Sequence, residues 1–136
     1  MMKVQNNVGR LCEVLYRDPL TQDELTEFTL EVRRLVSVAA EPLVFACDWR
    51  RIQRFDRSIA DTIVWIMRRD NPRIEFNGIV VDAENGPFAA QVERILKEAG
   101  NPNRKSYPTV EALTAALSPR LTHVERTRLD QFLTTG

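Results

Sequence analysis

The chain has 136 residues, 43% of them hydrophobic and 28% charged, and its 19 basic and 19 acidic residues give a formal net charge of zero. This length fits one domain with a single hydrophobic core. The balanced charge argues against a general nucleic-acid or membrane-surface binder, and the longest apolar runs are far too short to span a bilayer. No secretory signal is visible at the N-terminus, so we expect a cytoplasmic protein.

Residues 1–7 are expected to form a loose start or a short edge strand, and the rest of the first third of the chain a strand and a helix. Apolar residues in the segment 8–16 indicate a strand, in which Glu13 suggests an end or edge position. Thr21 and Glu24 have the spacing of a capping box, which satisfies backbone N–H groups at a helix start. The helix that follows ends near Ala40. Its apolar stripe consists of Leu25, Phe28, Val32, Leu35 and Val36.

Residues 43–69 are predicted to form the centre of the fold, with a buried strand, a basic turn and a helix. The apolar run 43–47 suits a strand covered on both faces, and Asp48 would end it. Asp56 or Ser58 can cap the helix, because a short side-chain oxygen accepts from the free N–H groups of the first turn. Little of this helix is expected to meet solvent, because its apolar residues cover most of its faces: Ile59, Ala60, Ile63, Val64, Trp65, Ile66 and Met67.

The second half of the chain continues the alternation of strands and helices. Residues 74–82 indicate a strand, in which Gly78 marks a bulge or a close backbone approach. The next helix starts at Pro87 and ends at Gly100, and a short strand at 105–107 and another helix follow it. A last helix starts at Thr122 with capping-box spacing to Glu125, and it is expected to bury Val124, Leu129, Phe132 and Leu133.

Strands that alternate with helices predict an α/β fold with a mostly parallel sheet of four to five strands. We expect one domain, with a core at residues 8–117 and an additional C-terminal helix at 119–134. Cys12 and Cys47 lie inside predicted strands at a spacing that matches no metal motif, so we expect buried free thiols.

The order of elements and one motif resemble the STAS family, the anti-sigma-factor-antagonist-like domains. That family typically shows an apolar strand ending in Asp and an aliphatic residue four positions later. An apolar residue, Asp, Ser, Ser or Thr, and Gly then open the helix. The matching positions are Asp48, Ile52, Phe55, Asp56 and Ser58, whereas Arg57 replaces the usual serine and Ile59 the usual glycine. The resemblance covers roughly residues 8–117.

The resemblance implies a non-enzymatic regulatory domain that binds another protein. In antagonists of this type, the residue matched by Ser58 is phosphorylated by a partner kinase that also serves as the anti-sigma factor. The residues themselves also suit a phosphate at this position, because it would lie at a helix N-terminus beside Arg54 and Arg57. A simple capping role for Ser58 is the alternative.

We expect the contact surface at the carboxyl edge of the sheet, where open α/β folds bind their ligands. The local excess of arginine there could dock an acidic partner surface, a kinase-like partner or a phosphate-bearing ligand. A solvated turn with weak ion pairs is the alternative. The predicted contact residues are Arg50, Arg51, Arg54, Asp56, Arg57, Ser58, Ile59, Asp82 and Asn85.

Other functions have weaker support in the sequence. A small-ligand or lipid-binding domain that uses the same edge of the sheet is the main alternative, and a homodimer is another. His123 is the only histidine, and no nucleotide-binding or nucleophile-elbow motif occurs. A metal-dependent phosphate-accepting site would draw on acids near strand ends and a lysine, namely Asp48, Asp56, Asp82, Glu84 and Lys105. We expect no catalytic residue, cofactor or metal.

Overall fold

The computed structural model describes residues 1–135 and contains one five-stranded sheet in the order β1-β2-β3-β4-β5. β1 (Met2–Val8) and β2 (Leu11–Arg17) form an antiparallel hairpin. β3 (Leu43–Arg51), β4 (Ile74–Val80) and β5 (Arg104–Tyr107) continue the sheet in parallel from β2. The predicted α/β class, with a mostly parallel sheet of four to five strands, is therefore confirmed.

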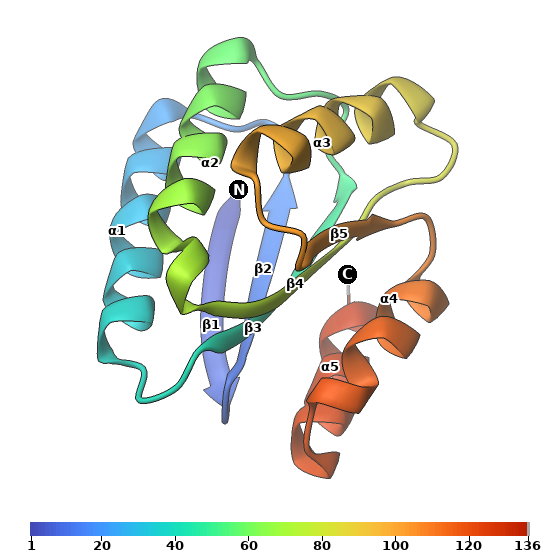
Figure 1. Ribbon diagram of the computed structural model, residues 1–136. Coiled ribbons are helices and arrows are strands. Elements are labelled where there is room, and N and C mark those ends of the chain that lie inside the picture. Colours follow the sequence, from blue (N-terminus) through green and yellow to red (C-terminus); the bar gives the residue numbers. More distant parts are fainter. Residues whose placement is uncertain (136) are drawn as a thin grey trace.

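Helices cover both faces of this sheet (Figure 1). The helices are α1 (Gln22–Val38), α2 (Arg57–Asp70), α3 (Gly86–Ala99), α4 (Val110–Leu117) and α5 (His123–Thr135), with short 3₁₀ turns at η1 (Asn71–Arg73) and η2 (Ser118–Arg120). Each of the three β–α–β crossovers moves one strand along the sheet in the same direction, so their right-handedness places α1, α2 and α3 on one face. After β5 the chain passes to the opposite face, where α4 and α5 pack.

The sheet separates two hydrophobic cores. The larger core lies under α1–α3 and contains an aromatic group in which Trp49 contacts Tyr16 and Phe55, each with ring centroids 5.2 Å apart. The smaller core lies under α4 and α5. There a Cβ added to Gly78 would lie 2.3 Å from Cδ1 of Leu113, so the predicted close backbone approach at Gly78 is confirmed.

β3 is longer than predicted, because it runs to Arg51 instead of ending at Asp48. Asp48 is 1% exposed and faces the smaller core, where the guanidinium of Arg50 donates to both of its carboxylate oxygens at 2.8 and 2.9 Å. The alternation of the strand places both side chains on one face, so the ion pair lets charged residues continue a buried strand.

Glu13 does not lie at an edge, which corrects the prediction. Its strand, β2, is hydrogen-bonded to β1 on one side and to β3 on the other. The Glu13 side chain is 3% exposed and accepts from Nε and Nη2 of Arg128 in α5, at 2.8 and 2.7 Å. A carboxylate can occupy this inner strand because a distant helix supplies its counter-ion.

Two apolar residues predicted to be buried are exposed. Trp65 in α2 is 57% exposed, and the guanidinium of Arg69 lies 5.2 Å from its ring centroid. Val124 in α5 is 61% exposed. Both lie on the outer sides of their helices, and other apolar residues of these helices pack against the sheet.

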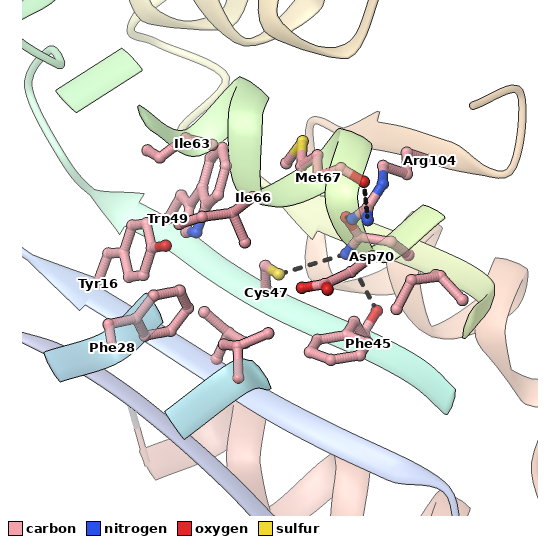
Figure 2. A pocket seen from close by; sticks show the side chains of 14 residues that line it. Tyr16, Phe28, Phe45, Cys47, Trp49, Ile63, Ile66, Met67, Asp70 and Arg104 are labelled. Atoms are coloured by element: carbon pink, nitrogen blue, oxygen red, sulfur yellow. Dashed lines mark hydrogen bonds between the residues drawn. The ribbon is translucent and has the colours of Figure 1, made fainter. Parts of the chain in front are cut away.

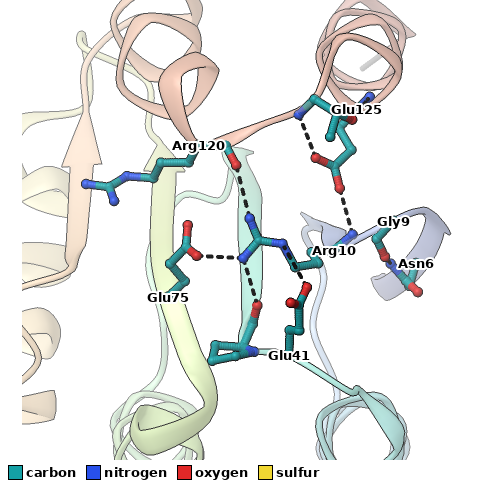
Figure 3. A network of polar contacts seen from close by, with 9 residues as sticks. Asn6, Gly9, Arg10, Glu41, Glu75, Arg120 and Glu125 are labelled. Carbon is teal, nitrogen blue, oxygen red and sulfur yellow. Dashed lines mark hydrogen bonds and ion pairs between the residues drawn. The ribbon is translucent and has the colours of Figure 1, made fainter.

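Arg10 joins the β1–β2 hairpin to four other parts of the molecule (Figure 3). Its guanidinium donates to Glu75 in β4 at 2.5 Å and to the carbonyls of Pro42 and Arg120, each at 3.3 Å. Its backbone N–H donates to the carboxylate of Glu125 in α5 at 2.7 Å. These contacts attach the additional C-terminal helix firmly to the sheet.

Several local predictions are confirmed. The hydroxyl of Thr21 accepts from the N–H of Glu24 at 3.1 Å, and Thr122 and Glu125 form the second capping box. Gly100 ends α3 with a left-handed φ of 73°. The two cysteines are buried free thiols, and burial raises the pKa of each to about 12. Among the described residues, no helix combines the length and the apolar character that crossing a membrane requires.

Candidate protein-binding site at the carboxyl edge of the sheet

The candidate site lies at the carboxyl edge of the sheet, and we call it the rim. It consists of residues 52–58, which connect β3 to α2 and include the first two residues of that helix, and residues 82–85, which connect β4 to α3. The side-chain amide of Asn85 donates to the carbonyl of Gln53 at 3.0 Å. The two connections are therefore joined directly.

The backbone of the first connection is held by side chains from outside it. The carboxylate of Asp18 accepts from the N–H of Gln53 at 2.6 Å. Gln91 in α3 accepts from the N–H of Phe55 at 3.0 Å and donates to its carbonyl at 2.9 Å. Phe55 is 2% exposed and packs edge-on against Trp49 and Phe88. This part of the rim is consequently a fixed platform.

The platform presents five polar side chains to solvent: those of Gln53, Arg54, Asp56, Arg57 and Ser58. Asp56 is the N-cap residue of α2, but its side chain makes no capping hydrogen bond. Ser58 lies in the first turn, and its hydroxyl accepts from the amide of Gln22 in α1 at 2.9 Å. Arg54 and Arg57 form no ion pair with any residue in the range 1–135.

An open groove between α2 and α3 extends this surface. Arg54 and Arg57 line it together with Arg94 from α3, and acidic side chains, including Asp61 and Glu98, lie along the same groove. Arg94 was not predicted as part of this surface. Gln91 and Asp18 were not predicted to hold the first connection in place. Their only signal in the sequence is a polar residue on a helix or in a turn, which many positions share.

Two of the predicted contact residues do not belong to the rim surface. Arg50 lies on the opposite face, where its guanidinium pairs with Asp48 and also donates to the carbonyl of Leu133 at 3.1 Å. The hydrogen bond to Asp48 raises the pKa of Arg50. Ile59 is 4% exposed, so its side chain is part of the core and not of the surface. Arg51 is exposed at the end of β3.

Asp82 and Asn85 have local roles in the second connection. Asp82 is exposed, and its carboxylate accepts from the N–H of Glu84 at 2.9 Å. Asn85 is half-buried and accepts from the N–H of Phe88 at 3.2 Å, which caps α3. Asn85 therefore holds the backbone of the rim in place and adds little to its exposed surface.

The acidic residues of the strand ends do not gather into one site. Asp48 is buried with Arg50, Asp56 is exposed at the start of α2, and Asp82 accepts a hydrogen bond within the next connection. In the described part of the chain, no group of three or more His, Cys, Asp and Glu residues could hold a metal ion. His123 is exposed in the first turn of α5.

The topology also limits what this edge of the sheet can bind. Doubly wound sheets bind ligands in the crevice where helices on opposite faces diverge from neighbouring strands. Here all three parallel crossovers lie on the same face, so no such crevice separates β2, β3 and β4. The chain turns to opposite faces after β4 and β5, and an open depression lies between these two connections, lined by residues that include Arg50, Asp82, Thr109 and Glu111.

No protein-family model matches the chain, and no curated protein or solved structure matches it either. The fold defines the chain as an α/β protein with a mostly parallel five-stranded sheet. The resemblance to the STAS family stays a prediction.

Proposed function

We propose that this protein is a non-enzymatic, STAS-type regulatory module that binds another protein through the rim. The observation that carries the proposal is the platform at residues 52–58. Its backbone is fixed by Asp18, Asn85 and Gln91, while Arg54 and Arg57 extend from it without an ion-pair partner in the described chain. A surface that is already ordered loses little conformational entropy on binding, and arginine is enriched in protein interfaces.

Arginine also indicates the chemistry of the partner. A planar guanidinium forms paired hydrogen bonds with carboxylate or phosphate groups, so the partner would present an acidic surface to Arg54 and Arg57. A kinase-like partner that both binds and modifies the rim would fit the STAS resemblance.

Ser58 is the proposed switch within this surface. Its hydroxyl is exposed and accepts a hydrogen bond from the side-chain amide of Gln22. Phosphorylation would add roughly −1.5 to −2 charges next to the rim arginines and would compete with an acidic partner for them. We therefore expect the modified protein to bind its partner more weakly.

A small ligand or lipid at the same edge is the second candidate. The open depression around Arg50 is the observation that favours it. We rank it lower because Arg50 is already paired with Asp48 and because the depression is open to solvent.

Affinity capture from native cells, followed by binding measurements with the purified prey, tests the proposal. The variant Arg54→Glu/Arg57→Glu should lose one specific prey, because four units of charge change at the platform. The matched control Lys97→Glu/Lys105→Glu makes the same charge change at exposed positions away from the rim and should keep it. Identical prey for all three proteins would refute the rim as the binding surface.

Two further measurements separate the parts of the proposal. Mass spectrometry of Ser58 in protein from native cells, together with partner binding by Ser58→Glu and Ser58→Ala, tests the switch. Equal binding by both variants and no phosphorylated Ser58 would eliminate the switch and leave the docking surface intact. Sedimentation at two concentrations tests the predicted homodimer.

A further inference from the structure

A small cavity lies inside the larger core, between the sheet and helices α1 and α2 (Figure 2). The space open to the centre of a water molecule is about 40 Å³. Every side chain that lines it is buried, and most are apolar or aromatic, including Tyr16, Phe28, Ile63 and Ile66. The cavity is separate from the rim and takes no part in the proposed protein contact.

One hydrogen-bond donor on the wall of this cavity is unpaired. The Trp49 side chain is 1% exposed, and its indole N–H has no hydrogen-bond partner among the described residues. The ring cannot easily turn to find one, because it is stacked on Tyr16 and held edge-on by Phe55. Buried donors without a partner are rare in folded proteins, so this group points to an acceptor that binds from outside the chain.

The polar groups at the other end of the cavity already have partners. The amide of Asn77 donates to Sγ of Cys47 and to the carbonyl of Phe45, both at 3.3 Å, and Arg104 donates to Oδ1 of Asn77 at 2.9 Å. Asp70 accepts two hydrogen bonds from Arg69, at 2.9 Å each. No unpaired charge remains there to compensate a charged ligand for the loss of its hydration.

The size of the cavity limits the ligand further. A buried water needs roughly 10–15 Å³ of such space and occupies about 30 Å³ in the liquid, so the cavity could hold about three waters or an organic molecule of comparable volume. Mostly apolar walls disfavour a water cluster, because each water needs two or more polar partners.

We propose that this cavity is a binding site for a small neutral molecule, mostly apolar and with one carbonyl-type acceptor, that takes the hydrogen bond of the Trp49 indole N–H. The ligand class follows from the wall, the unpaired Trp49 donor and the volume. The site is independent of the proposed protein-binding function, and either can fail without the other.

Acetone and isobutene are matched probes, because they have the same shape and differ in the acceptor. In nitrogen-labelled Trp65→Phe protein, the one remaining indole N–H signal belongs to Trp49, and it should shift saturably with acetone. Isobutene leaves the donor unpaired, but acetone loses hydrogen bonds to water on entering the cavity, so the ratio of the two affinities reports the hydrogen bond to Trp49. In Trp49→Phe, followed by the methyl signals of Ile63 and Ile66, the affinity of acetone relative to that of isobutene should fall several-fold, up to about tenfold.

A second pair of variants keeps the proposal testable if Trp49→Phe does not fold. Val32→Ile adds a methyl group to the cavity wall and should abolish binding of both probes. Leu30→Ile alters an exposed position of the same helix and should bind both as before. The proposal is overturned by a shift that does not saturate, by the same ratio of acetone to isobutene affinity with and without Trp49, or by unchanged binding to Val32→Ile.

Discussion

At Gly78, α4 lies so close to β4 that no side chain fits between them. A Cβ would meet Leu113, which is fully buried, at 2.3 Å. We expect Gly78→Ala to lower the free energy of unfolding by about 1–3 kcal/mol, because the packed core must shift to make room. Gly86→Ala is the control, since a Cβ there would have no neighbour within 4 Å. Urea denaturation measures both, and equal stabilities would contradict the prediction.

The burial of Glu13 makes its counter-ion important. Arg128 is about a third exposed, but it is the ion-pair partner of a carboxylate that is almost completely buried. Arg128→Ala should lower the free energy of unfolding by roughly 2–4 kcal/mol, because the Glu13 carboxylate would stay buried without the positive charge that pairs with it. Arg34→Ala removes a similar pair with Glu31 on the surface and should change little.

The rim depends on contacts between elements, and Gln91 provides the most specific one. Its two hydrogen bonds to Phe55 connect α3 to the first connection of the rim. Gln91→Ala should lower the free energy of unfolding by about 1–2 kcal/mol. It should also speed up tryptic cleavage after Arg54, because the platform loses one of its supports. Gln22→Ala, which removes only the contact with Ser58, is the control and should leave the cleavage rate nearly unchanged.

The attachment of α5 should depend on pH through Glu125. Burial by itself raises the pKa of Glu125, but hydrogen bonds from the N–H groups of Thr122 and Arg10 outweigh it, so the pKa lies below its usual value of 4.5. A lowered pKa in the folded state means that the stabilisation is present above the pKa of the unfolded chain and is lost as the pH falls through the folded pKa.

We therefore expect the stability difference between the wild type and Glu125→Gln to be largest above pH ~5 and to shrink on acidification. Urea denaturation between neutral and acidic pH measures this difference. A difference that stays constant across this range, or grows with acid, would show that the charge of Glu125 does not hold α5.

On the scale of the whole molecule, the two cores share the central strands of one sheet. Val44 and Ala46 face the smaller core, while Phe45, Cys47 and Trp49 on the same strand face the larger one. The loss of either core should therefore unfold the other, and the protein should unfold in one cooperative transition.

Truncations in the two cores test this coupling. Phe28→Ala in α1 and Leu129→Ala in α5 should each lower the free energy of unfolding by roughly 2–5 kcal/mol. In Leu129→Ala, the fluorescence of Trp49, on the far side of the sheet, should change together with the far-UV circular dichroism. Two separated transitions would mean that α4 and α5 unfold on their own.

The sequence by itself determined the α/β class, the alternation of strands and helices from β2 onward and the capping boxes, and it reduced Gly78 to a bulge or a close approach. These features depend on residues that are neighbours in the chain or on a local backbone requirement, so periodicity and spacing were sufficient to predict them. The exposure of Ser58 and Arg57 at the start of α2 also followed from local signals.

Only the tertiary structure decided which polar residues act together. Arg128 reaches Glu13 and Gln91 reaches Phe55 across long distances in the sequence, and α5 approaches Arg50 in the same way. It also decided that Trp65 meets solvent while Trp49 faces an interior cavity. The physical reason is that burial depends on how helices rotate and pack against the sheet, and no single segment of the chain carries that information.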